Sequence, residues 1–158
     1  MQELKDRIVK EGKVLPGNII KVDGFLNHRI DTELMDHIAE EFGKHFNMDE
    51  VTMILTAEAS GIALSAIVAH HFHKPMIFAK KAKSDNIEGG LYQSDIYSYT
   101  YKKKVTLLVS KEWLSSDDKV LVIDDFMANG EAMRGLCDIV TAAGATLVGI
   151  GCAVEKGF

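Results

Sequence analysis

The chain has 158 residues, of which 47% are hydrophobic and 26% are charged, and its formal net charge at pH 7 is −5. This length and composition predict one globular domain with its own core and argue against disorder. The apolar runs are too short for a membrane-spanning helix, and the charged, helical pattern of the N-terminus, MQELKDRIVKEG, argues against a signal peptide. The acidic charge balance also argues against a nucleic-acid binder, whose surface usually carries a basic stripe, so neither nucleic acid nor a membrane is an expected partner.

The N-terminal third predicts two helices separated by irregular structure. Residues 3–11 have a helical pattern that ends at a glycine. Residues 13–29 mix proline, glycine and aspartate with apolar residues, which predicts packed, irregular structure with short extended pieces. Asp31 or Thr32 can cap a second helix that runs to about residue 46, because apolar residues recur there at helical spacing.

Two strand–helix–strand units follow, each built from short apolar runs on either side of a helical segment. Their ranges are 51–56, 61–72 and 75–80 for the first unit, and 119–124, 131–143 and 145–155 for the second. Such units have parallel strands, and two of them predict an α/β fold with a doubly wound sheet. In such sheets ligands bind beyond the carboxyl ends of the strands.

A hairpin is expected between the two units. Residues 95–100 and 105–110 read as its strands, joined by Tyr101–Lys104. The polar, glycine-rich residues before it, 84–94, lie beside the expected active face and are a candidate lid.

The run VLVIDDFMANGEA, residues 120–132, carries the clearest chemical pattern. Backbone N–H groups of Ala128–Ala132 at a helix N-terminus can bind an anion. Asp124 and Asp125 at the end of the strand can accept hydrogen bonds from sugar hydroxyls or bind Mg²⁺ through water. Together these features suit ribose 5-phosphate, but by the pattern alone an ordinary turn with solvated acids is an equal alternative.

This run resembles the phosphoribosyl pyrophosphate signature of the type I phosphoribosyltransferases. The loop Ala128-Asn129-Gly130-Glu131-Ala132 has the form of the bacterial branch that acts on xanthine, whereas most branches carry Thr and Gly. Further stretches match that branch: KVDGFLNHRID (21–31), TAEASGIALS (56–65) and VEKGF (154–158). The resemblance implies one domain over 1–158, with a mostly parallel doubly wound sheet, a small N-terminal hood from residues 1–30 and a lid hairpin.

The resemblance also implies a reaction. The 5-phosphoribosyl group would move from phosphoribosyl pyrophosphate to xanthine, giving xanthosine 5′-monophosphate and pyrophosphate in purine salvage. Asp124 and Asp125 would contact the ribose hydroxyls and stabilise positive charge on the ring. Residues Ala128, Asn129, Gly130, Glu131 and Ala132 would hold the 5-phosphate. Mg²⁺ would be carried by the substrate oxygens, without a direct protein ligand.

Pyrophosphate would bind at a second turn. The family places its pyrophosphate loop at AEASGIA, where Ser60 and Gly61 can present backbone N–H groups at a helix N-terminus. Lys81 is the expected cation, with Lys80 and Lys83 as second choices. Glu58 would orient backbone or metal-bound water. Locally, a plain Ser60 helix cap and a solvated lysine cluster are the alternatives.

Four residues are expected at the purine. The resemblance places xanthine contacts at Ile20, Asn27 and Lys156, and Phe126 could stack on the ring. Asn27 can donate and accept, and Lys156 would favour an electron-poor, acidic purine. From local sequence alone, a core Ile20, a helix-capping Asn27 and an exposed Lys156 are the simpler interpretations.

Two rival functions follow from the same features: transfer to guanine, hypoxanthine or adenine, and a regulator that senses phosphoribosyl pyrophosphate without catalysis.

A homodimer is the family expectation, and the two cysteines in apolar segments, Cys137 and Cys152, suit a reducing cytoplasm. The resemblance implies a further strand–helix segment beyond VEKGF, which is not among the 158 residues.

Overall fold

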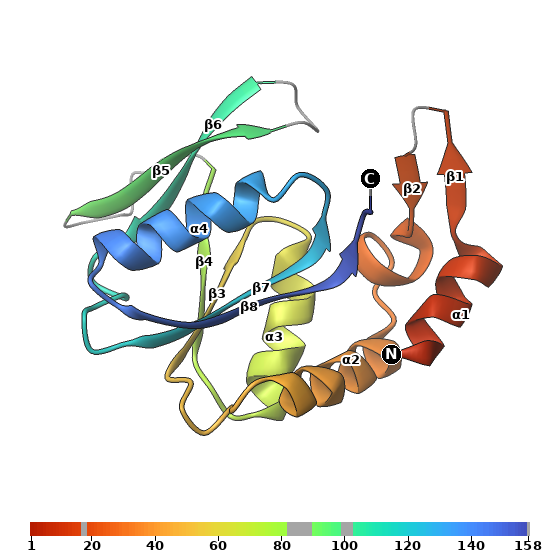
Figure 1. Ribbon diagram of the computed structural model, residues 1–158, viewed down its shortest axis with the longest axis horizontal. Helices are drawn as coiled ribbons and strands as arrows, with labels where there is room; N and C mark the ends of the chain where they lie inside the picture. Colours follow the sequence, from red (N-terminus) through yellow and green to blue (C-terminus); the bar gives the residue numbers. More distant parts are fainter. Residues whose placement is uncertain (17–18, 82–89, 99–102, 158) are drawn as a thin grey trace.

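A four-stranded parallel sheet forms the centre of the molecule in the computed structural model, which describes residues 1–16, 19–81, 90–98 and 103–157 (Figure 1). The strand order is β4-β3-β7-β8. The strands are β3 (Met53–Ala57), β4 (Met76–Ala79), β7 (Lys119–Met127) and β8 (Thr146–Glu155). The sheet is parallel throughout, so the predicted doubly wound α/β class is confirmed.

Two crossover helices cover opposite faces of this sheet. α3 (Gly61–His71) joins β3 to β4, and α4 (Glu131–Ala142) joins β7 to β8. Neighbouring residues of β3 therefore enter different cores: Ile54 packs in the cluster that contains α3, and Leu55 packs in the cluster that contains α4. The two central strands, β3 and β7, are buried on both faces along most of their length, which explains their mainly apolar sequences. No helix in the described ranges is long and apolar enough to span a membrane.

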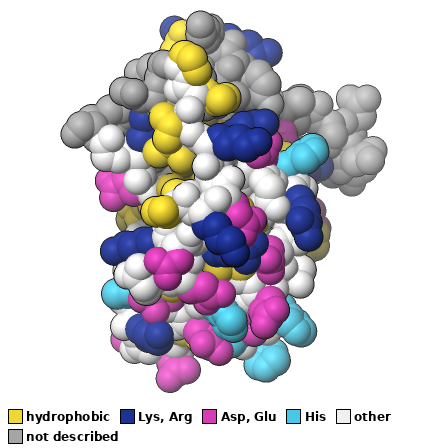
Figure 2. Space-filling model, turned by 90° about the vertical axis from the view of Figure 1, so that its right-hand side faces the viewer, with side chains coloured by type: hydrophobic (Ala, Val, Ile, Leu, Met, Phe, Trp, Pro, Cys, Tyr) yellow, Lys and Arg dark blue, Asp and Glu magenta, His cyan; other side chains and the backbone are white. Residues whose placement is uncertain are grey.

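The N-terminal segment packs on the α3 side of the sheet. It consists of α1 (Gln2–Glu11), β1 (Lys13–Leu15), β2 (Ile19–Lys21), a π-helical turn η1 (Asp23–Asn27) and α2 (Thr32–His45). The Asp31 carboxylate accepts the Leu34 N–H at 3.2 Å, which confirms the expected cap of α2. β1 and β2 are the short extended pieces, whereas the π-helical turn was not predicted. Figure 2 shows this side of the molecule, where acidic and basic side chains are interspersed.

The predicted hairpin is present and packs against α4. Its strands are β5 (Leu91–Ser98) and β6 (Lys103–Ser110), paired antiparallel. The prediction began the first strand too late, because residues 91–94, assigned to the lid, already pair with β6. The rest of the expected lid from 84 to 89, and residues 101 and 102 of the connection, lie outside the described residues.

Candidate active site

A cleft of about 360 Å³ opens at the carboxyl ends of β3 and β7. Its walls come from both strand ends, the turns that follow them, the N-terminal segment and the β5 strand. This is the edge where ligands of parallel α/β sheets bind.

The two adjacent aspartates lie within β7 and not beyond it. The prediction ended this strand at Asp124, but β8 continues alongside and pairs Asp124 with Cys152 and Met127 with Glu155. Both carboxyl groups line the cleft and are buried, with exposed fractions of 9% for Asp124 and 1% for Asp125. They are therefore not the solvated acids of the alternative interpretation.

Hydrogen bonds fix this pair of acids from two sides. The Asp125 backbone N–H donates to Asp124 Oδ1 at 2.9 Å, and the Ser60 hydroxyl donates to Asp125 Oδ1 at 2.8 Å. Asp125 Oδ2 is buried without a hydrogen-bond partner among the described residues. Burial, followed by the negative charge of Asp125, raises the pKa of Asp124 well above its usual value, and Lys81 opposes this rise. A cationic group in the cleft would therefore be favoured electrostatically.

The turn after β3, residues 58–60, is connected to the acids and to the next strand. The Glu58 carboxylate accepts the Lys81 backbone N–H at 2.6 Å, so it orients backbone, one of the two roles expected for it. The Glu58–Ala59 peptide bond is cis. Ser60 occupies the N-cap position of α3, but its hydroxyl makes no cap bond and donates to Asp125. The interpretation of Ser60 as a plain helix cap is therefore wrong.

Gly61, the first residue of α3, lies behind the acids and does not line the cleft. A Cβ at this position would collide with Thr56 Oγ1 and would lie 2.6 Å from Asp124 Oδ1. The missing side chain thus allows the helix to approach the strand ends closely.

The three lysines that follow β4 are separated by the structure. Lys81 lines the cleft. Lys80 instead exchanges backbone hydrogen bonds with Leu108 of β6, and it borders a different hollow. Lys83 lies outside the described residues. Of the two described lysines, Lys81 is placed to reach an anion in the cleft.

The turn after β7 brings residues Ala128–Ala132 to the cleft wall. Gly130 has φ +72°, a left-handed conformation that favours glycine, and its carbonyl accepts the Arg134 N–H at 2.8 Å. The first N–H groups of α4 have no acceptor within the helix, which makes this turn suitable for an anion.

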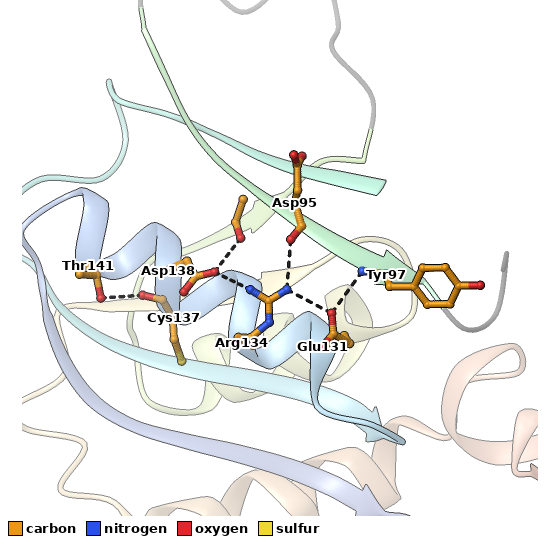
Figure 3. A network of polar contacts seen from close by, with 8 residues as sticks. Asp95, Tyr97, Glu131, Arg134, Cys137, Asp138 and Thr141 are labelled. Atoms are coloured by element: carbon orange, nitrogen blue, oxygen red, sulfur yellow. Dashed lines mark hydrogen bonds and ion pairs between the residues drawn. The ribbon is translucent and has the colours of Figure 1, made fainter. Parts of the chain in front are cut away.

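Glu131, the first residue of α4, has a carboxylate that is already engaged (Figure 3). It accepts from Arg134 Nη2 at 3.1 Å and from the Tyr97 backbone N–H of β5 at 3.2 Å. The side chain is therefore tied to the hairpin, and what Glu131 can offer an anion is its backbone N–H. The Glu131–Arg134 pair has the i, i+3 spacing of a predicted helix, but the sequence contained no signal for the contact with Tyr97.

The four residues expected at the purine are only partly brought together. Ile20, Asn27 and Phe126 line the cleft, and Ile20 and Phe126 also pack on the core. Lys156 does not line it; its backbone N–H donates to the Met127 carbonyl at 2.9 Å, directly beyond β8. Sequence reasoning gave no role to five further lining residues: Ala57, Ile96, Tyr97, Met127 and Met133.

Comparison with known proteins agrees with this geometry. Residues 25–157 match the model of the phosphoribosyl transferase domain family. A xanthine phosphoribosyltransferase from Lachnoclostridium phytofermentans is 52% identical, and the match covers the whole of this chain and 81% of the relative. A protein of the same name from Bifidobacterium adolescentis is 51% identical, with 82% of its length covered.

Solved structures share the fold at low identity. The adenine phosphoribosyltransferase of Saccharomyces cerevisiae superimposes with a TM-score of 0.78 at 15% identity, covering 99% of this chain and 90% of that one. The enzyme of Trypanosoma brucei, solved with AMP, pyrophosphate and ribose-5-phosphate, gives 0.76 at 22% identity, covering 96% of this chain and 67% of that one.

Proposed function

The chain belongs to the phosphoribosyl transferase domain family, and on this premise we propose that it transfers the 5-phosphoribosyl group of phosphoribosyl pyrophosphate to xanthine. The products are xanthosine 5′-monophosphate and pyrophosphate, and the role is purine salvage. One observation carries the proposal: a buried aspartate pair and the N-terminus of α4 face the same cleft. Residues 1–158 act as one domain, and residues 1–30 contribute the hood over the base.

The aspartates and the second turn take the ribose 5-phosphate part of the substrate. Asp124 and Asp125 accept hydrogen bonds from the ribose hydroxyls, and they stabilise the positive charge that develops as the bond to pyrophosphate breaks. Their burial strengthens this interaction because the local dielectric constant is low. Backbone N–H groups of Ala128–Ala132 bind the 5-phosphate.

The first turn takes the pyrophosphate. Ser60, which lines the cleft, offers its backbone N–H at the start of α3, with the N–H of Gly61 directly behind it, and Lys81 offers a positive charge from the cleft wall. Mg²⁺ enters bound to phosphoribosyl pyrophosphate, because it sheds its waters reluctantly and suits phosphate oxygens. Its charge assists departure of the leaving group.

The base binds between the N-terminal segment and the end of β7. Ile20 and Phe126 provide apolar surface for the ring, and Asn27 hydrogen-bonds to the purine edge. Lys156, next to Met127 of the cleft wall, provides the positive charge that favours xanthine. The enzyme acts as a homodimer in the cytoplasm; its two free, partly buried cysteines suit that reducing compartment.

The test is release of pyrophosphate from phosphoribosyl pyrophosphate and Mg²⁺ with each of xanthine, guanine, hypoxanthine and adenine. We expect the highest kcat/KM with xanthine. A higher value for another base would identify a transferase of different specificity. Binding of phosphoribosyl pyrophosphate without turnover of any base would identify a sensor. Absence of binding would refute the proposed phosphoribosyl pyrophosphate site.

A further inference from the structure

Glu131 raises an electrostatic problem at the proposed phosphate turn. It is the first residue of α4, it lines the cleft, and its side chain is 32% exposed. A carboxylate at this position would repel a phosphate bound to the neighbouring N–H groups. The protein must therefore neutralise or redirect this charge if the turn is to bind an anion.

Arg134 meets the Glu131 carboxylate one helical turn later. Its Nη2 lies 3.1 Å from Glu131 Oε2 and also 3.1 Å from the backbone carbonyl oxygen of Asp95 in β5. Its Nη1 lies 3.0 Å from Asp138 Oδ2. The planar guanidinium thus joins three acceptors on two elements, a geometry that a lysine cannot reproduce.

Tyr97 completes the redirection of the carboxylate. Its backbone N–H donates to Glu131 Oε2 at 3.2 Å, so the carboxylate is held toward β5 (Figure 3). The hydrogen bond from Arg134, and then that from Tyr97, lowers the pKa of Glu131. The negative charge is thus retained and compensated, and it is not removed by protonation.

The same contacts attach the hairpin beside the cleft. Ser94 Oγ donates to Asp138 Oδ2 at 2.9 Å. A Cβ on Gly135 would lie 2.5 Å from Ile96 Cγ2, so this glycine permits the close approach of β5 to α4. Ile96 and Tyr97, which line the cleft, are therefore positioned by contacts with the helix that carries Glu131 and Arg134.

We propose that Arg134 is a positioning residue for the 5-phosphate of phosphoribosyl pyrophosphate. It holds the Glu131 carboxylate against β5 and compensates its charge, and so leaves the N–H groups of the second turn available to an anion. This inference rests on the proposed function, because it assigns the phosphate to that turn.

The experiment compares wild type with four variants. Calorimetry gives the Kd for ribose 5-phosphate, and initial rates give kcat and the KM for phosphoribosyl pyrophosphate. Arg134→Ala should raise Kd and KM about tenfold and change kcat less than about twofold, because an uncompensated carboxylate then faces the anion. Glu131→Gln should lower Kd, because it removes the repelling charge and leaves the positive charge of Arg134 without a carboxylate to compensate it. Glu131→Gln/Arg134→Ala should bind within about twofold of wild type, even where its thermal stability stays low.

Asp138→Ala is the matched control. It removes contacts of the same network with Ser94 and Arg134 but leaves the Glu131–Arg134 pair, so Tm should fall while Kd stays unchanged. The inference is overturned if Arg134→Ala binds like wild type, or if the double variant binds as weakly as Arg134→Ala. Failure of wild type to bind ribose 5-phosphate would instead refute the phosphate site, and with it the proposed function.

Discussion

The turns after β3 and β7 both lead from the end of a parallel strand into a helix, and both carry a glutamate beside the cleft. In the turn after β3 the polar side chains reach inward: Glu58 accepts from the Lys81 backbone, and Ser60 donates to buried Asp125. In the turn after β7 the glutamate reaches outward, to Arg134 and the hairpin.

The two turns are therefore held in place for anion binding by different parts of the fold. The first turn is fixed by the central sheet, so changes in it should disturb the aspartates as well. The second turn is fixed by a left-handed glycine and by contacts with β5, so changes in it should mainly affect phosphate affinity. In both turns an acid that would repel phosphate is engaged elsewhere.

The largest effect is expected at the aspartates between the two turns. Asp124→Asn should lower kcat about 10²- to 10³-fold, because charge stabilisation of the ribosyl cation is lost. At a pH above the raised pKa of Asp124, the same change should increase Tm by about 2–4 °C, since the amide avoids the cost of burying an ionised carboxylate.

The pH dependence of that gain has a definite sign. The folded-state pKa of Asp124 is raised above its unfolded value. The contribution of Asp124 to the free energy of unfolding is therefore fully present at low pH and is lost as the pH rises through the folded-state pKa. The gain in Tm should therefore be larger at pH 8 than at pH 5, as scanning calorimetry would show. Exposed Asp117→Asn is the control and should change neither quantity; a pH-independent gain would contradict the burial effect.

Gly61→Ala should have the next largest effect. The new Cβ meets Thr56 Oγ1 and Asp124 Oδ1, so the carboxylate or the helix must shift. We expect a loss of about 1–3 kcal/mol in the free energy of unfolding and a fall in kcat of about tenfold or more. Denaturant titration and initial rates measure both; an unchanged kcat would show that the first turn is independent of the aspartates.

Gly130→Ala is the matched change in the second turn. Its Cβ meets nothing within 4 Å, but φ +72° costs an alanine about 1–2 kcal/mol. The Kd for ribose 5-phosphate should rise by up to about tenfold, with kcat at saturating substrate nearly preserved. If kcat falls as it does in Gly61→Ala while Kd is unchanged, the distinction between the two turns is lost.

Lys156→Gln, outside both turns, should have the smallest effect. We expect the ratio of kcat/KM for xanthine to that for hypoxanthine to fall by a few-fold, on the order of 1 kcal/mol, because a positive charge near the base is lost. Affinity for ribose 5-phosphate should not change. An unaltered ratio would remove Lys156 from base recognition.

The strands and helices of the sheet were predictable because their apolar runs are long and regular. The end of β7 was not, since Asp125–Met127 are held in the strand by pairing with β8, which a local pattern does not reveal. By contrast, the direction of the parallel strands was enough to assign the acids and both turns to the carboxyl edge of the sheet. The places of Ile96, Tyr97 and Arg134 at the site depend on how the hairpin packs on α4 at Gly135. Nothing in the local sequence of these residues indicates that packing.

The most direct measurement is a titration of backbone amide NMR shifts with ribose 5-phosphate and, separately, with magnesium pyrophosphate. Ribose 5-phosphate should shift the amides of residues 128–132 and leave those of residues 58–61 in place, and pyrophosphate should do the reverse. If either ligand shifts both turns equally, or each shifts the opposite turn, the division of phosphoribosyl pyrophosphate between the two turns is wrong.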